Sequence, residues 1–251
     1  MSALAGKRFG FLGAGAIAEV FIRRLLGSGM ARAEDILAYD IKGPIPERLA
    51  GTFGVRAVQS NSEVVAGSDL VFLAVPPLAA AVSTELMEQA IGKPAPVVRL
   101  IPNTPSWIGE GMNPFCFGSH VGRMEADEVR ELLKVFGEAE EIPEEPMAIA
   151  TALTAVGPTY VFPVITALAD AAIAHDLPPN VAPPAACQVV LGAAKLVAET
   201  GRSPNSLSLM IGTHALDEIV TQKLFTQAIE DAHAKIKATE VKVAEGAIAK
   251  R

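Results

Sequence analysis

Short apolar segments alternate with helix-like segments along the first 75 residues. An apolar run at 8–12 precedes apolar residues at helical spacing over 17–27, and a second apolar run lies at 36–39. The alternation continues with a helix-like segment at 45–53, a strand-like one at 55–58, a helix-like one at 61–66 and a strand-like one at 70–75. This pattern predicts an α/β fold of the Rossmann type, with a doubly wound parallel sheet.

The pattern changes after the first 140 residues. A further buried strand at 97–101 and an amphipathic helix at 125–136 are expected in the same α/β layer. Segment 140–146 is acidic and contains proline, as inter-domain linkers often do, so we divide the chain into domains 1–145 and 146–251. Beyond it the strand pattern stops, and an all-helical domain is predicted with helices at 159–174, 184–200, 206–224 and 225–248.

The predicted helices of the second domain are apolar around much of their circumference. About 100 residues cannot hide so much apolar surface in a small bundle, so we expect a partner subunit, in a homodimer or an assembly of dimers. The uncharged stretch 146–169 is longer than the roughly 20 residues that span a bilayer. Because it contains Gly157, Pro158 and Pro163, a buried helix is favoured over a membrane span.

Charge and cysteine content narrow the function classes. The chain has 251 residues and a formal net charge of −7, from 21 Lys and Arg against 28 Asp and Glu, which argues against a nucleic-acid partner. Lys7 and Arg8 interrupt the position of a secretory apolar segment, so a cytoplasmic protein is expected. Cys116 and Cys187 have no CxxC or histidine-rich surroundings, so neither a disulfide framework nor a metal site is predicted.

A glycine-rich turn follows the first predicted strand. Residues 13–18 read Gly-Ala-Gly-Ala-Ile-Ala, which matches G-x-G-x-x-A between a strand and a helix. Gly13 permits a tight turn, and Gly15 lets the backbone approach a pyrophosphate at the start of the helix, beside Ala16 and Ile17. The alternative is a small-residue turn of an unrelated α/β protein.

A carboxylate at the end of the second strand strengthens the prediction of dinucleotide binding. Asp40 is placed to bond the adenosine ribose and to oppose a 2′-phosphate, so NAD(P)H is the expected cofactor and NADH is favoured. Lys42 weakens this preference because it could reach a phosphate, although a lone loop lysine is more often solvated surface.

Six segments in order extend the comparison along most of the chain: 11–18 (Phe-Leu-Gly-Ala-Gly-Ala-Ile-Ala), 74–77 (Ala-Val-Pro-Pro), 98–105 (Val-Arg-Leu-Ile-Pro-Asn-Thr-Pro), 157–162 (Gly-Pro-Thr-Tyr-Val-Phe), 167–171 (Ala-Leu-Ala-Asp-Ala) and 190–195 (Val-Leu-Gly-Ala-Ala-Lys). With them the chain resembles the pyrroline-5-carboxylate reductase family. The resemblance implies a Rossmann domain followed by a helical dimerisation domain, with the active site between the nicotinamide end of one subunit and helices at the dimer interface. Further cofactor-binding residues are then expected at Asn61, Ala74, Val75, Pro76 and Asn103.

The reaction that this resemblance implies is hydride transfer to the C=N carbon of a cyclic imino acid, a small molecule, giving proline. The imine must be protonated, and the substrate carboxylate must be anchored. In the family the anchor is a Ser-Pro-Gly-Gly-Thr-Thr-like turn, and the corresponding segment 209–214 is shortened here to Leu-Met-Ile-Gly-Thr-His. Gly212, Thr213 and His214 are therefore the catalytic candidates, and Glu218 lies one helical turn after His214.

Other departures from the family leave the substrate open. The family's Ser-Gly-Ser before Gly157 is 154–156 (Thr-Ala-Val) here, its lysine after Val75 is Pro76, and a strand and helix are reduced to 87–96. One alternative is a β-hydroxyacid dehydrogenase-like enzyme that uses Lys195 as acid and base. A second is a dimeric dinucleotide-binding protein without reductase activity. His214 could also be a solvated histidine at a helix start.

Overall fold

The computed structural model describes residues 4–74, 82–212 and 216–248. By its contacts the chain forms two compact units. The N-terminal unit consists of Met1–Ala155 together with Ala232–Arg251, and the helical unit consists of Val156–Asp231. The last helix therefore belongs to the helical unit in its first part and to the N-terminal unit in its second.

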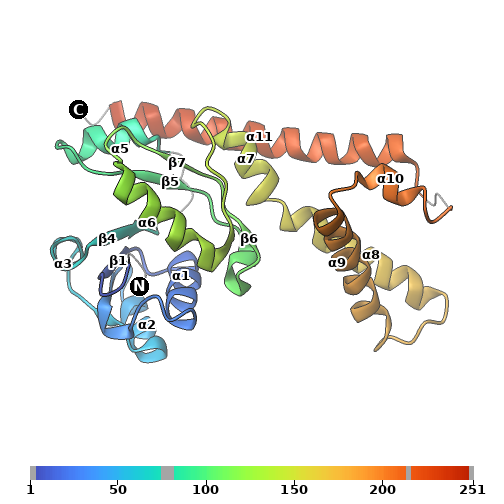
Figure 1. Ribbon diagram of the computed structural model, residues 1–251, viewed down its shortest axis with the longest axis horizontal. Helices are drawn as coiled ribbons and strands as arrows, with labels where there is room; N and C mark the ends of the chain where they lie inside the picture. The colour runs from blue at the N-terminus through green and yellow to red at the C-terminus, as the bar shows by residue number, and fades with distance from the viewer. Residues whose placement is uncertain (1–3, 75–81, 213–215, 249–251) are drawn as a thin grey trace. The chain divides into compact units, whose positions relative to one another are not determined.

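A four-stranded parallel sheet organises the N-terminal unit (Figure 1). Its strands lie in the order β3-β2-β1-β4, and Phe9 of β1 pairs with Ile36 of β2 and Leu70 of β4. The prediction of a Rossmann-type sheet is confirmed, although the third strand is only two residues long. The elements are β1 (Phe9–Leu12), α1 (Ala16–Gly27), η1 (Ala33–Asp35), β2 (Ile36–Tyr39), α2 (Ile45–Phe53), β3 (Arg56–Ala57), α3 (Asn61–Gly67) and β4 (Leu70–Leu73).

Aromatic side chains fill the space between the sheet and its helices. Phe11 stacks on Phe72 with ring centroids 4.8 Å apart, and Phe21 of α1 lies 4.2 Å from Phe136. Phe9, Phe11 and Phe136 are fully buried. Because β1 is hydrogen-bonded on both sides and apolar on both faces, it lies at the centre of the core.

The segment after β4 does not continue this sheet in the part of the chain that is described. β5 (Val98–Leu100) pairs antiparallel with β7 (Phe115–Phe117), and β6 (Gly111–Met112) pairs parallel with β8 (Gly137–Glu138). The expectation that 97–101 belongs to the same layer is therefore wrong, because β7, which follows within 20 residues, supplies the partner. The remaining elements are α5 (Thr84–Ile91), η2 (Thr104–Ile108), α6 (Arg123–Leu133), η3 (Lys134–Phe136) and α7 (Met147–Thr154).

In the described part of the chain after α7 the helices are α8 (Pro158–Ala174), α9 (Ala182–Thr200), α10 (Pro204–Ser208) and α11 (Glu218–Ile248). The predicted helix at 206–224 is wrong, since α10 ends at Ser208 and α11 begins only at Glu218. Two local features explain the break. Gly212 has a left-handed backbone with φ of 71°, and the Asp217 carboxylate accepts the N–H groups of Ile219 and Val220 at 2.9 and 3.0 Å, starting the new helix.

The helical unit has little core of its own. Among its described residues the buried apolar side chains are those of Ala169, Ala182 and Ala186, where α8 packs on α9. Larger apolar side chains on the same helices, such as Phe162 and Val189, are exposed by 56% and 62%. By length and composition one described stretch, Met147–Ala174, could cross a membrane, but a single stretch of this kind is weak evidence for a span. It is interrupted between α7 and α8.

Candidate dinucleotide site

The glycine-rich turn lies at the carboxyl ends of β1 and β2. The backbone of Gly13 has a φ of 95°, a conformation that side chains disfavour, and its N–H donates to the Tyr39 carbonyl at 2.9 Å. Ala14, between the two glycines of the turn, is fully buried. The first glycine is thus required by backbone conformation, as the motif predicts.

The start of α1 is open to a ligand. Gly15 occupies the N-cap position and has no side chain to cap the helix. Apart from Gly15 and its two chain neighbours, no described atom lies within 4 Å of the point that a Cβ of Gly15 would occupy. Ala16 and Ile17, the first two residues of the helix, are exposed. Free N–H groups, an open approach and the positive end of the helix dipole suit a pyrophosphate.

Asp40 is tied to the turn by both carboxylate oxygens. Its Oδ2 accepts the N–H of Ala14 at 2.9 Å, and its Oδ1 accepts the N–H of Lys42 at 2.8 Å. Each oxygen retains a second lone pair, so the carboxylate can still receive a ribose hydroxyl. Sequence reasoning missed the contact with Ala14, because the two residues are 26 positions apart and no local pattern joins them. The Lys42 side chain is exposed.

Of the other described cofactor candidates, Ala74 lies beside the turn, Asn61 is exposed, and Asn103 is bonded to another part of the chain. The N–H of Ala74 donates to the Leu12 carbonyl at 2.8 Å, so Ala74 lies beside the turn at the end of β4. Asn61 is exposed at the start of α3, which is capped by Ser60. The side-chain amide of Asn103, by contrast, already donates to the Thr154 carbonyl of the same chain at 3.1 Å.

Several predicted residues cannot be placed in this site. Val75 and Pro76 of the cofactor set, and Thr213 and His214 of the catalytic set, lie outside the described residues. Gly212 is exposed in the helical unit. Lys195, the residue of the alternative mechanism, is exposed on α9 of the same unit. The structure therefore brings together Gly13, Gly15, Ala16, Ile17, Asp40 and Ala74.

A buried arginine outside the predicted set connects distant parts of the N-terminal unit. Arg99 of β5 is 7% exposed and donates to Glu144 at 3.2 Å and to Glu240 of α11 at 2.8 Å. Burial would raise the pKa of Glu240, but hydrogen bonds from Arg99 and Lys237 outweigh it and hold the pKa below its ordinary value. The available signal in the sequence was a single charge inside the apolar run 97–101.

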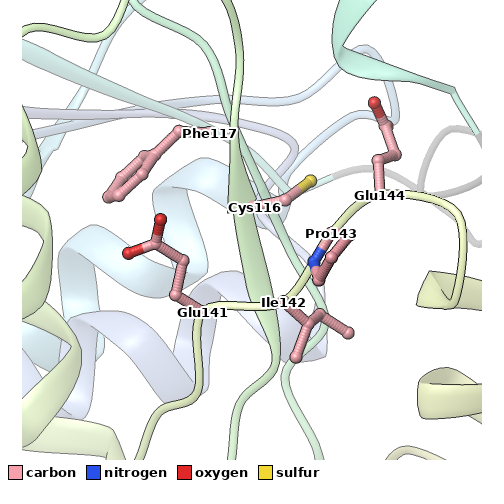
Figure 2. A pocket seen from close by; sticks show the side chains of 6 residues that line it. All are labelled: Cys116, Phe117, Glu141, Ile142, Pro143 and Glu144. Atoms are coloured by element: carbon pink, nitrogen blue, oxygen red, sulfur yellow. The ribbon is translucent and has the colours of Figure 1, made fainter.

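A hollow of about 540 Å³ lies between β7 and the segment before α7 (Figure 2). Figure 2 shows Phe117 and Cys116 pointing to opposite sides of the strand, as successive strand residues do. The two carboxylates that line the hollow already have partners. Glu141 accepts a hydrogen bond from Arg130 at 2.7 Å, and Glu144 accepts one from Arg99. Burial, with the nearby Glu144 charge, raises the pKa of the Cys116 thiol to about 11. The hollow therefore offers no free carboxylate and no thiolate for chemistry.

Comparisons with known proteins agree with the two-part organisation. Residues 144–239 match the family described as "Pyrroline-5-carboxylate reductase dimerisation". Residues 8–98 match the family described as "NADP oxidoreductase coenzyme F420-dependent". The first match covers the helical unit, whose apolar surface is largely exposed in a single chain.

Whole-chain relatives share one name. A pyrroline-5-carboxylate reductase of Escherichia coli is 30% identical over 230 residues, covering 82% of this chain and 84% of the relative. One of Methanosarcina acetivorans is 29% identical over 254 residues, covering 89% and 94%. Pyrroline-5-carboxylate reductase 3 of Bos taurus is 30% identical over 259 residues, covering 90% and 83%.

Solved structures show the same fold. The Plasmodium falciparum pyrroline carboxylate reductase with NADP bound superposes with a TM-score of 0.81 at 22% identity, covering 94% of this chain and 99% of that one. The pyrroline-5-carboxylate reductase of Coxiella burnetii superposes with a TM-score of 0.74 at 23% identity, covering 95% and 98%.

Proposed function

Because this chain belongs to the pyrroline-5-carboxylate reductase family, we propose that it transfers a hydride from NAD(P)H to the C=N carbon of a cyclic imino acid, giving proline or a related cyclic amino acid. The protein is an NAD(P)H-dependent oxidoreductase that acts on a C=N bond. The observation that carries this assignment is the glycine-rich turn at an open helix start, in a chain whose whole-length relatives are named for this reaction.

The residues at the carboxyl edge of the sheet fit a dinucleotide. The N–H groups of Ala16 and Ile17 would receive the pyrophosphate, for which Gly15 leaves room. Asp40 would receive a ribose hydroxyl while it holds the turn through Ala14. Ala74 would form part of the wall at the end of β4. Val75 and Pro76, which follow it in the sequence, remain candidates outside the described residues. When bound, the reduced nicotinamide supplies the hydride.

The remaining chemistry is to anchor the substrate carboxylate and to keep the imine protonated. Backbone N–H groups at Gly212 and Thr213 are our candidates for the anchor. His214 is the candidate acid, because an imidazole titrates near neutral pH. A protonated His214 could instead pair with the carboxylate and replace donors lost from the shortened segment.

The finer assignments follow the same residues. NADH is preferred over NADPH, since the Asp40 carboxylate opposes a 2′-phosphate. The protein works as a homodimer or an assembly of dimers, with the exposed apolar faces of α8 and α9 covered by the partner. It acts in the cytoplasm on a small molecule, and its net charge of −7 disfavours nucleic acid.

A substrate panel tests the proposal. Purified protein is mixed with NADH and pyrroline-5-carboxylate, other cyclic imines or keto acids, and the loss of NADH absorbance is followed, with proline identified as a product. We expect turnover on a cyclic imine, and Lys195→Met should retain it. Oxidation of a hydroxy acid with NAD⁺ in place of NADH, seen as a gain of NADH absorbance in wild type and lost in Lys195→Met, would favour the dehydrogenase alternative. Tight NADH binding without turnover on any imine would contradict the proposal.

A further inference from the structure

An ion pair joins the first two helices of the N-terminal unit, close to the glycine-rich turn. Nη1 of Arg48, on α2, donates to Oε2 of Glu19, on α1, at 3.0 Å. The Glu19 N–H donates to the Gly15 carbonyl at 3.0 Å, so Glu19 lies one helical turn beyond the open helix start. Arg48 has the matching place on α2, because its N–H donates to the carbonyl of Pro44, the N-cap residue, at 3.1 Å. The pair therefore lies near the edge of the sheet that carries the cofactor candidates.

The geometry of a helix directs both side chains toward that edge. α1 follows β1 and α2 follows β2, so both helices begin at the carboxyl edge of the sheet and run away from it. The Cα–Cβ bonds of a helix tilt toward its N-terminus. The long side chain of Arg48 therefore extends toward the same edge as Asp40, whose carboxylate accepts the N–H groups of Ala14 and Lys42 there.

The partner of Arg48 can be exchanged. Among the described residues its guanidinium pairs with Glu19, and the two side chains are 52% and 23% exposed. An ion pair this exposed is weak, because water and salt screen it, so another anion can compete for the guanidinium. Arg23, which lies 3.5 Å from the other oxygen of Glu19, is held elsewhere, over the rings of Phe53 and Trp107 at 5.1 and 5.5 Å from their centroids. Of the two arginines, Arg48 is therefore the one that a new anion would attract.

We propose that Glu19 is a specificity-determining residue, which withholds Arg48 from the 2′-phosphate of NADPH and so adds to the preference for NADH. This inference rests on the cofactor part of the proposed function. NADPH differs from NADH by a phosphate on the ribose that Asp40 is expected to receive, and a guanidinium is well suited to bind a phosphate. Asp40 repels that phosphate, and Glu19 occupies the cation that would otherwise attract it.

Calorimetric titration tests this role without any turnover. The probes are 5′-AMP and adenosine 2′,5′-bisphosphate, which differ only in the 2′-phosphate, followed by NADH and NADPH. In Glu19→Gln, which keeps the size of the side chain but removes its charge, the Kd of both 2′-phosphorylated ligands should fall about threefold, in keeping with the strength of an exposed ion pair. The Kd of 5′-AMP and of NADH should stay at the wild-type value. The gain should shrink at high salt, because the new contact is also an exposed pair of charges.

A second variant tests whether Arg48 is responsible for the gain. Arg48→Gln added to Glu19→Gln should return the Kd for NADPH to at least the wild-type value. Arg48→Gln by itself should change the Kd for NADPH little, because in the wild type Glu19 already occupies the guanidinium.

The matched control is Glu34→Gln, which removes the same charge from another carboxylate that is paired with an arginine. Glu34 pairs with Arg32 at 3.0 Å and lies in η1, just before β2 and so at the opposite edge of the sheet. It should leave all four Kd values unchanged, which would exclude an effect of net charge alone.

The proposal is overturned if the Kd for NADPH is unchanged in Glu19→Gln, or if NADH and NADPH gain equally, since Glu19 would then only repel the pyrophosphate. It is also overturned if the gain persists without Arg48, which would assign the phosphate contact to Lys42, or if Arg48→Gln by itself weakens NADPH binding. Wild-type protein that binds NADH but is inactive on every imine would contradict the proposed reaction and leave these titrations valid. Wild-type protein that binds none of the four ligands would overturn both.

Discussion

At the scale of single residues, Asp40 has two tasks that compete in any substitution. Its carboxylate orders the turn through the Ala14 and Lys42 N–H groups, at 2.9 and 2.8 Å, and its charge faces the expected position of a ribose. Replacing it therefore changes both the shape of the turn and the choice of cofactor. An experiment on Asp40 must therefore distinguish a change in the preference between NADH and NADPH from a loss of affinity for both cofactors.

Asp40→Ser should shift the ratio of kcat/KM toward NADPH by about tenfold, or roughly 1.4 kcal/mol, because repulsion of the 2′-phosphate is relieved. Affinity for both cofactors should fall, since the Ala14 N–H loses its acceptor. Steady-state kinetics with both cofactors measure this. Asp40→Asn, which loses the charge but keeps an acceptor, is the control and should shift preference with less loss of affinity. A wild-type enzyme that already prefers NADPH would contradict the prediction.

His214 is the titratable candidate in the shortened segment. If it protonates the imine or pairs with the carboxylate, kcat/KM should fall as pH rises through the range in which an ordinary imidazole loses its proton, about 6.5. His214→Asn should remove that limb and lower kcat/KM at least about tenfold, roughly 1.4 kcal/mol. Profiles of kcat/KM against pH for both proteins provide the measurement. Identical pH profiles and rates in the two proteins would contradict a role in the reaction and favour the interpretation of His214 as a solvated histidine.

At the scale of elements, the open start of α1 is a place where a substitution should change ligand binding without changing the stability of the fold. Gly15 has an ordinary φ of −76°, and no described atom lies near the position of its Cβ, so the fold does not require a glycine there. A bound pyrophosphate would require a glycine at position 15, because it would approach the backbone closely.

Gly15→Ala should therefore lower NADH affinity about tenfold, roughly 1.4 kcal/mol, while Tm stays within a few degrees of wild type. Fluorescence titration and thermal unfolding test the two halves. Gly27→Ala is the matched control, because it lies at the other end of α1 and its Cβ position is also empty. Equal NADH binding in the two variants would show that no ligand approaches Gly15.

The contact between β5 and α11 should weaken in acid. The pKa of Glu240 lies below its ordinary value, so the carboxylate stabilises the fold above the unfolded value of about 4.3. That contribution is lost as pH falls through the lower, folded value. Urea midpoints between pH 6 and pH 3 should fall for wild type and fall less for Glu240→Gln, in which Lys237, Arg99 and Glu144 remain. Parallel curves would show that Glu240 contributes no acid sensitivity.

At the scale of the whole molecule, we expect a partner to cover the helical unit. Its buried apolar side chains among the described residues are alanines, and these cannot supply the apolar burial that stabilises a bundle. The exposed face of α8 and α9 carries the larger side chains. A dimerisation-family match over 144–239 agrees with this distribution.

Light scattering at low micromolar concentration should show at least a dimer. Phe162→Glu, a charge on an exposed apolar position of α8, should shift the protein toward monomer, because burying the carboxylate in an interface costs several kcal/mol. Met124→Glu introduces the same charge at a 74% exposed position of α6 in the N-terminal unit and should leave the assembly intact. A stable wild-type monomer would contradict the prediction.

Local sequence patterns were enough to predict the parallel sheet and the position of its glycine-rich turn. Both depend on local patterns: apolar runs of strand length, apolar residues at helical spacing, and a glycine between the first strand and the first helix. The structure shows why a glycine is needed there, since the φ of Gly13 is 95°. The sequence also indicated the family, through six short motifs in order. The predicted helix at 206–224 was wrong because the left-handed Gly212 and the capping carboxylate of Asp217 outweighed the helical periodicity of that segment.

Contacts between groups far apart in the chain became visible only in the folded protein. Arg99 bonds to carboxylates 45 and 141 positions away, and Asp40 accepts an N–H from 26 positions earlier. The antiparallel pairing of β5 with β7 likewise depends on which strand reaches its edge. Hydrogen bonds between segments far apart in the chain have no local periodicity, because their geometry exists only after the core has packed.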